Sequence, residues 1–566
     1  MTALPAVPPS VAADAVDALP TRLRRKLDDL LPAARAWPVT ETPEGYAVIV
    51  DADTVVTLCR VVTTAEDLRC GCLLAPRCLH RAAVASLAPT AEDAGPAGDA
   101  GPAAAPAPAE APTAPPVTPV EAAAATALWD AAVAVLLTGI PGAGAVPQAV
   151  LLRAAHEARG ARLPRGASAA IRVVEHLRAA HRDDPAFRLG ELVADLRELL
   201  LVAHGLRSGR PLRGTARREY RLVGARRLYG LCCEPVLTAS GYAGAVVHLV
   251  DDTGQGWRVA DVQPGGVDRA AYAPDALAPV GEARLTLRDL GRAGLLATDL
   301  RASADGRIST GRDVRAVATT GVCWSEPPLA GLWRVPVREQ VARYHAGLDR
   351  PVAERPAGYD LAFLAGRIAG ATRAGLLLAT DTATVLVVPP HDTPGLPYVD
   401  NLRLLAAAVG AEITLVGRFA GGGRVEAIAA GGAWVGEPGH VDLGVDRLTR
   451  AMTPAPGVPP ETAEPALEPP PLHLLGRRVE RAVEGGRPAV PGDPRDAGLL
   501  RAAALPTAAG LVDRLESACR VERDVFGRAV AAGADGFARA WLAASVYLTA
   551  TARSLELARW SPGTVG

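Results

Sequence analysis

Two kinds of hydrophobic spacing alternate along the chain. Apolar residues recur at helical spacing, with glycine or proline between the stretches, in residues 120–137, 147–159, 167–181 and 189–204. Between residues 214 and 448 the apolar runs are short, as in AGAVVHLVDD and WRVADV, and turn residues separate them. The pattern predicts a helical domain at 118–206 and a β-rich domain at 214–448, the second interrupted by helices at 337–346 and 360–369.

The two ends of the chain carry the same patterns. Residues 23–34 have helical spacing, and the alternating run GYAVIVDADTVVTL at 45–58 predicts two short strands joined around Asp51 and Asp53. From residue 472 onward the chain is helical again, with a long pattern over 508–558 that is interrupted near Gly533. We therefore expect an α+β multidomain protein with a helical C-terminal domain at 472–566.

Two segments have almost nothing to bury. Residues 88–117 are nearly all Ala, Pro, Gly and acidic residues, and residues 453–471 are similarly rich in proline. Such compositions form extended, semi-rigid linkers. We expect the first linker to let the N-terminal region, residues 1–87, move independently of the rest.

Composition narrows the class of protein. The chain has 566 residues, of which 49% are hydrophobic and 4% aromatic, and its formal net charge is -1, which is typical of a soluble globular protein. Any surface for nucleic acid must then be a local patch.

Lys26 is the only lysine among 60 basic residues, so no lysine follows a glycine-rich Walker A loop and a P-loop nucleotide site is excluded. The arginine bias indicates a GC-rich genome, and we expect an actinobacterial source.

The sequence predicts a cytoplasmic protein. Residues 1–20 have neither the basic residues nor the apolar run of a secretory signal. The most apolar helical stretch, 120–138, contains Glu121 and Asp130, so we expect no membrane span and no membrane partner. In a reducing compartment, clustered cysteines favour metal binding over disulfides.

Four potential metal ligands lie within eleven residues. The segment CGCLLAPRCLH contains Cys70, Cys72, Cys78 and His80 in the pattern C-x-C-x5-C-x-H. Cys70 and Cys72 project to one side of an extended strand, and Gly71 allows the chain to bend around an ion. Two residues of α-helix turn a side chain by roughly 200°, so Cys78 must precede the helix that contains His80 and ends at about residue 87. Three thiolates and one imidazole complete the four-coordinate shell of structural Zn²⁺.

This pattern, with a hairpin before it and a helix after it, resembles the SWIM zinc finger, whose signature is C-x-C, a variable gap and C-x-H. The resemblance covers residues 45–87 and implies a small ββα finger in which Cys70, Cys72, Cys78 and His80 bind zinc. It also implies a module that binds DNA or another protein. The family usually has a basic residue between the last two ligands, where this chain has Leu79.

The most basic stretch of the chain is a second candidate site. Between residues 206 and 230 a single acid, Glu219, accompanies eight arginines, which are Arg207, Arg210, Arg213, Arg217, Arg218, Arg221, Arg226 and Arg227. Guanidinium groups with interleaved tyrosines can contact phosphates and bases. The alternative is a solvated connection whose arginines pair with acids elsewhere.

The remaining cysteines favour packing roles. Cys59 could be an alternative metal ligand, but it ends an apolar strand pattern, where a buried thiol is expected. Cys232 and Cys233 are adjacent, so their side chains should enter the core on opposite faces of a strand.

Two functions fit these features. The first is a zinc-binding protein, not an enzyme, whose SWIM-like finger contacts a protein or DNA within a larger assembly. The second is an enzyme of unknown reaction in the 214–448 region, with the finger as a targeting module. Near-neutral charge favours the first function with a protein partner.

Overall fold

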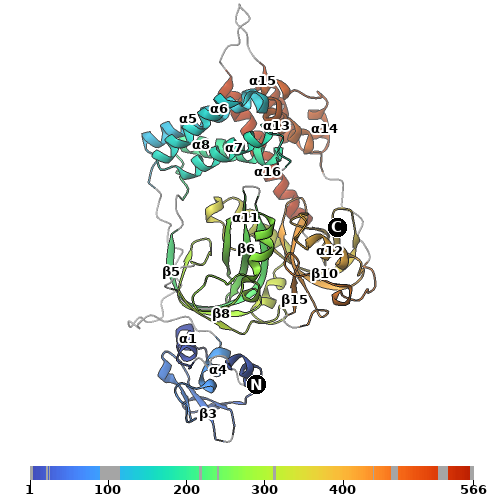
Figure 1. The fold of residues 1–566 in the computed structure, drawn as a ribbon. Helices are drawn as coiled ribbons and strands as arrows, with labels where there is room; N and C mark the ends of the chain where they lie inside the picture. Colours follow the sequence, from blue (N-terminus) through green and yellow to red (C-terminus); the bar gives the residue numbers. More distant parts are fainter. Residues whose placement is uncertain are drawn as a thin grey trace, which may run out of the picture. The chain divides into compact units, whose positions relative to one another are not determined.

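A computed structural model describes the chain except for residues 1–3, 21–22, 24–25, 52, 90–114, 186, 216–218, 239–240, 310–313, 437–438, 461–469, 521–532 and 561–566. The chain forms two compact units (Figure 1). Unit 1 comprises Met1–Pro102, Arg218–Glu464 and Arg559–Gly566, and unit 2 comprises Ala103–Arg217 and Pro465–Ala558. The chain contains both helices and strands, as the sequence predicted. Residues 90–114 of the first predicted linker, 88–117, and residues 461–469 of the second, 453–471, lie outside the described residues.

The N-terminal lobe of unit 1, residues 4–89, is a four-stranded antiparallel sheet with helices. Its strands, in the order β1-β2-β3-β4, are Val39–Thr42, Gly45–Ile49, Val55–Cys59 and Leu68–Cys70. Its helices are α1 (Pro9–Asp17), α3 (Leu27–Ala34), the 3-10 turn η1 (Ala65–Asp67) and α4 (Leu79–Leu87). The two strands expected at 45–58 are β2 and β3, whereas α1, β1 and β4 were not anticipated.

A five-stranded antiparallel sheet forms the middle of unit 1. Its order is β7-β6-β5-β8-β9, with bounds Gly256–Pro264, Tyr242–Asp251, Tyr220–Leu237, Gly294–Ser303 and Arg315–Thr319. Two short helices, α9 (Val267–Tyr272) and α10 (Leu287–Leu290), pack against it. Cys232 and Cys233 of β5 enter two different hydrophobic clusters, as their adjacency predicted.

The last part of unit 1 is a small barrel. Strands β10 (Leu361–Ala371), β11 (Leu376–Ala379) and β12 (Thr384–Val388) form an antiparallel meander, and β13 (Glu412–Phe419) returns beside β10 in a Greek-key arrangement. Strand β14 (Arg424–Gly431) pairs with both β13 and β12 and closes the barrel, and β15 (His440–Asp442) extends it. Helix α12 (Tyr398–Ala406) connects β12 to β13, and α11 (Val337–Leu348) covers β10.

The segment 360–369 is a strand and not the helix that its composition predicted. Leucine and alanine favour helices, but β10 pairs with β11 along one edge and with β13 along the other. Residues 361–364 are all buried, so the alternation typical of a half-exposed strand is hidden.

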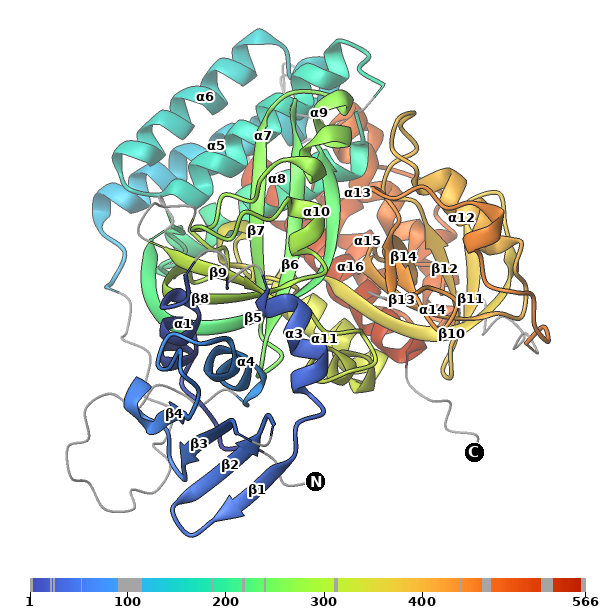
Figure 2. The ribbon, with the colours of Figure 1, turned by 60° about the horizontal axis from the view of Figure 1, so that its bottom comes forward.

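The N-terminal lobe does not have the independence that the sequence led us to expect. Helix α1 packs on β8 and β5, and these elements lie side by side in Figure 2. Leu296 of β8 belongs to the same buried cluster as Val11 of α1 and Val84 of α4. The lobe and the five-stranded sheet therefore share apolar contacts, and α1, which the sequence pattern did not indicate, provides most of them.

Buried charges join the barrel to the five-stranded sheet. Glu234 on β5 is only 4% exposed, and its Oε1 accepts a hydrogen bond from Arg418 Nη2 on β13 at 2.6 Å. His248 Nε2 lies 2.9 Å from the same oxygen, and Arg418 Nε donates to Asp360 at 2.9 Å. Burial alone would raise the pKa of Glu234, but the Arg418 cation and the hydrogen bond with His248 lower it to about 2. Glu234 is therefore ionised, and its ionisation depends on the Arg418 cation.

The regular secondary structure in the described part of unit 2 is all helical. Its elements are α5 (Pro119–Gly142), α6 (Ala145–Gly160), α7 (Pro164–His181), α8 (Leu189–Arg207), α13 (His473–Gly485), η6 (Arg487–Ala489), α14 (Asp496–Ala502), α15 (Pro506–Cys519) and α16 (Ala534–Arg559). The first four match the predicted helices closely. Residues from both helical segments, 118–206 and 472–566, form one hydrophobic core, so the two regions assigned to separate domains share their packing.

Two glycines allow the helical segments to approach closely. A Cβ atom on Gly139, where φ is 65°, would lie 2.3 Å from the backbone nitrogen of Gly486. A Cβ atom on Gly486, where φ is 76°, would lie 2.7 Å from the carbonyl oxygen of Leu137. Only glycine fits both the positive φ and the contact distance.

Helix α5 is long and apolar enough to cross a membrane, although we expected no such stretch because of Glu121 and Asp130. Glu121 lies in the first turn, where it completes a capping box with Thr118, so the rest of the helix is almost uncharged. Leu128, Trp129 and Leu136 are buried in the core of unit 2. Core helices often have this length and composition.

We predict that Arg418→Met destabilises the contact between β5 and β13 by about 3 kcal/mol, because it leaves the buried carboxylate of Glu234 without its main cation. Native-state hydrogen exchange of these strands measures the loss. The control is Arg367→Met, which breaks an exposed pair with Glu412 at 2.8 Å and should cost at most about 1 kcal/mol. Equal losses in the two variants would contradict the importance of the buried pair.

Candidate metal centre

The first two cysteines lie where strand β4 ends. Cys70 is the last residue of β4 and pairs with Val56 of β3, and Gly71 N–H donates to the carbonyl of Val55 at 3.0 Å. The chain then turns, with Ala75 N–H donating to the carbonyl of Cys72. The β3–β4 pairing thus fixes the chain direction from which both thiols approach the site.

Cys78 and His80, the third and fourth potential ligands, lie at the start of helix α4. Cys78 is the N-cap, with extended backbone angles of φ -120° and ψ 154°, and the helix begins at Leu79. His80 is therefore in the first turn. This is the arrangement that the spacing required, with Cys78 before the helix and His80 inside it.

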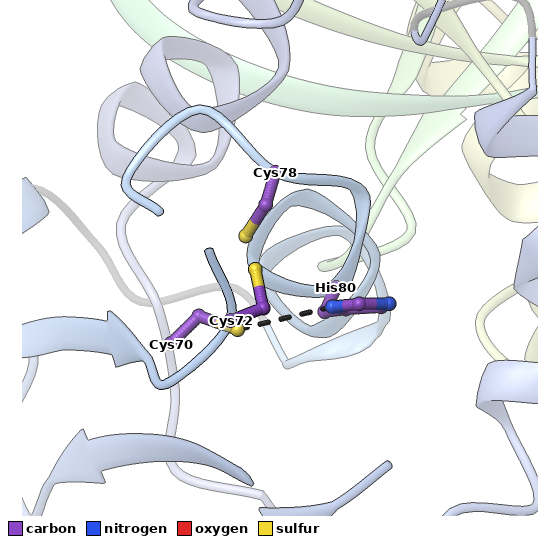
Figure 3. Close-up of side chains that lie close together, drawn as sticks. All are labelled: Cys70, Cys72, Cys78 and His80. Atoms are coloured by element: carbon purple, nitrogen blue, oxygen red, sulfur yellow. Dashed lines mark hydrogen bonds between the residues drawn. The ribbon is translucent and has the colours of Figure 1, made fainter. Parts of the chain in front are cut away.

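The four side chains converge on one point (Figure 3). Their ligand atoms all lie within 4.8 Å of one another, and Cys70 Sγ is 3.9 Å from His80 Nδ1. Sulfur atoms bound to one zinc ion at about 2.3 Å in a tetrahedron are separated by about 3.8 Å. The side chains therefore need only small movements to bind a metal ion.

Burial is uneven across the cluster. Cys78 is buried, whereas Cys70, Cys72 and His80 are partly exposed. Burial raises the pKa of Cys70 to about 12 and raises the pKa of Cys78. Burial also opposes ionisation of Cys72, but hydrogen bonds from the Leu74 backbone and from the neighbouring thiols lower its pKa. Three thiolates at one point repel each other, and a divalent cation is the group that would allow all three to ionise.

Two residues that we did not single out support the cluster. Arg81 is 6% exposed, and its guanidinium donates to the carbonyl of Pro76 at 3.0 Å and to the carbonyl of Ala65. It therefore ties the ligand loop and η1 to helix α4. The ring of Trp37 meets the ring of His80 edge-on at 6.0 Å. Sequence reasoning missed both, although Arg81 directly follows a ligand.

Cys59 is exposed, so the buried thiol expected at this position is wrong. It is the last residue of β3, opposite Gly45, and its side chain is on the open side of the sheet. The described metal cluster does not include it.

A groove lies beside the cluster within unit 1. It has a volume of about 940 Å³, and Trp37 of the lobe and Tyr229 of β5 both line it. The Tyr229 hydroxyl donates to Asp252 at 2.8 Å, and Arg227 lies over the Tyr229 ring at 5.4 Å. Trp37 is thus part of the groove wall, and its ring also contacts the His80 ring.

The arginines that belong to unit 2 mostly make internal contacts. Arg213 Nε donates to Glu121 at 2.5 Å, and this hydrogen bond is the main reason that the pKa of Glu121 falls to about 2. Arg207 lies over the ring of Trp129 at 5.0 Å. Arg210 is exposed in the turn after α8.

The arginines that belong to unit 1 lie on or near β5. Arg227 is half-buried, and Nη1 donates to the carbonyl of Ala88 at 3.5 Å. Arg226 Nη1 donates to the neighbouring Ala225 carbonyl, and the exposed Arg221 pairs with Glu219 at 3.3 Å. Arg217 and Arg218, the other two members of the predicted patch, lie outside the described residues.

The fold and the cluster define a two-unit α+β protein with a Cys₃His group that could hold a metal ion. Comparisons with protein-family models, curated proteins and solved structures find no match to this chain.

We predict that the purified protein binds one Co²⁺ or Zn²⁺ ion per chain and that Cys78→Ser abolishes this binding, because it removes the most buried sulfur. Cobalt bound by three thiolates gives a sulfur-to-metal charge-transfer absorption, which measures the site directly. Cys59→Ser is the matched control and should leave the absorption unchanged. Loss of absorption in the Cys59 variant, or its persistence in the Cys78 variant, would contradict this ligand set.

Proposed function

We propose that Cys70, Cys72, Cys78 and His80 bind one structural Zn²⁺ ion and that the lobe is a SWIM-like finger. The convergence of four ligand atoms within 4.8 Å carries this proposal. Three sulfurs and one nitrogen suit zinc and fill a tetrahedral shell, so no position remains for a catalytic water. The ion would join the end of β4 to the start of α4 and hold the ligand loop in place.

We further propose that the finger contacts another protein. Between the second and third ligands, Leu73 is fully exposed and Leu74 is 62% exposed. Large apolar side chains held outward by a rigid metal loop are suited to a protein interface. Residues 1–89 contain nine Lys and Arg against ten Asp and Glu, so the lobe lacks the excess positive charge that DNA binding requires.

Nucleic-acid binding is the second candidate and rests on the basic stretch. Of its described members, Arg207, Arg210 and Arg221 are exposed, whereas Arg213 and Arg227 are partly buried and donate to protein acceptors. Contacts to phosphates would therefore fall to a minority of the eight arginines. This makes DNA a weaker candidate than a protein partner. We propose that this chain and its protein partner are both cytoplasmic.

An enzyme in the 214–448 region is less well supported. The most strongly shifted acid there, Glu234, is buried and already paired with Arg418 and His248. A second groove of about 690 Å³ lies over β10 and β13, and its ionisable residues Arg367 and Glu412 pair with each other. No specific observation in the described residues favours a reaction over a binding role.

We predict that Leu73→Ser with Leu74→Ser removes the bound partner without loss of zinc. Affinity purification from the native cell, quantified by mass spectrometry beside zinc analysis, measures both. The control is Leu277→Ser with Leu499→Ser, which changes two exposed leucines outside the lobe. If the same proteins are recovered with both double variants, the ligand loop is not the contact surface. A salt-sensitive shift of duplex DNA by the wild type would favour the second candidate.

We also predict that removing the metal with a chelator unfolds the lobe locally. Hydrogen exchange should become fast in residues 45–87, because the loop and α4 lose their common anchor. Exchange in α1 should rise as well, since Val11 packs against Val84. Exchange in α5 and α8 should stay unchanged. Equal protection in the metal-free and metal-bound protein would show that the ion has no structural role.

A further inference from the structure

A cavity lined by arginines lies in unit 2, far along the sequence from the metal cluster. It has a volume of about 500 Å³, and Arg487, Arg514, Arg520 and Arg539 line it together with Ser517. The described residues that line it include no acid. Four guanidinium groups around one cavity form a strongly positive environment.

Arg487, in the short turn η6, is the most buried of the four. It is 9% exposed, and its Nη2 donates to the carbonyl of Arg520 at 2.7 Å. Its Nε is buried and has no hydrogen-bond partner among the described residues. A buried donor without a partner is costly, and an anion in the cavity would satisfy it.

Neighbouring side chains leave much of this positive charge uncompensated. Arg539 pairs with Asp535 at 2.7 Å, but the side chains of Arg514 and Arg520 have no hydrogen bond or ion pair among the described residues. The Cys519 thiol stays neutral near Arg487, because burial raises its pKa to about 11.

The acids of α15 are already engaged. Glu516 accepts a hydrogen bond from Arg478 at 2.7 Å, and Asp513 pairs with Arg501 at 2.5 Å. Neither residue is therefore free to neutralise the cavity.

The start of helix α16 adds a second source of positive potential. Gly533, directly before this 26-residue helix, and Gly536, in its first turn, line the cavity. The first backbone N–H groups of a helix have no partner within it, and they attract anions. Gly533 also lies beside the Arg487 guanidinium, since a Cβ there would be 3.4 Å from Nη2.

We propose that this cavity binds a small phosphate-bearing molecule with at least two negative charges, of the size of a nucleoside diphosphate. Guanidinium groups bind phosphate oxygens through paired hydrogen bonds, which favours phosphate over a carboxylate or a simple halide. The volume is within the range of small-molecule sites and too small for a folded partner. Arg487 anchors the anion, and the exposed Arg514 and Arg520 close around it.

Calorimetric titration of the full-length protein with inorganic pyrophosphate tests this proposal. The variant is Arg514→Gln with Arg520→Gln, because both side chains are exposed and have no hydrogen bond or ion pair among the described residues. We expect the wild type to bind pyrophosphate and the double variant to bind at least about tenfold more weakly. The control, Arg153→Gln with Arg477→Gln, removes two exposed charges elsewhere in unit 2 and should bind like the wild type.

Three results would overturn the proposal. The first is no heat of binding at about 1 mM pyrophosphate, which would exclude affinity of a physiological strength. The second is equal weakening in the control, which would indicate diffuse charge attraction. The third is a single-stranded oligonucleotide that binds through Arg514 and Arg520 far more tightly than pyrophosphate, which would indicate a nucleic-acid surface instead.

Discussion

Three thiols and an imidazole gathered at one point cannot form a stable group by themselves. The thiols resist ionisation when they are buried together, as the raised pKa values of Cys70 and Cys78 indicate, and a neutral cluster offers few strong hydrogen bonds. A divalent cation reverses this balance, because it ionises the thiols and binds them. We propose that the position of the ligand loop, the start of α4 and the exposure of Leu73 depend on that one interaction.

The lobe is joined to a larger body whose stability has a different origin. In the rest of unit 1, apolar clusters and the buried Glu234–Arg418 pair connect the five-stranded sheet to the barrel. In unit 2, helices from two distant segments share one core, and Gly139 and Gly486 allow their close contact. In our proposal the metal organises a small surface, and the rest of the chain relies on these other contacts for its stability. This arrangement suits a protein that presents a contact site.

Local signals in the sequence predicted the convergence of the four ligand-type side chains and most helices well. Spacing alone places Cys78 before a helix and His80 within it, because helical rotation allows no other convergence. The helices of unit 2 were visible because apolar residues recur at helical spacing over several turns and glycine or proline separates the stretches. Errors arose where tertiary packing decides the structure. Residues 361–364 are buried on both faces and pair with β13, so their leucines and alanines suggested a helix. Helix α1 and the exposed thiol of Cys59 depend on contacts far apart in sequence, which local patterns do not contain.

Zinc K-edge X-ray absorption of the purified protein tests the central claim most directly. A closed structural site predicts one zinc ion per chain with three sulfur neighbours at about 2.3 Å and one nitrogen neighbour at about 2.0 Å. Each distance reports on the ligands themselves, independently of any partner or activity. A protein without zinc, or zinc surrounded by oxygen neighbours, would contradict the proposed role of Cys70, Cys72, Cys78 and His80.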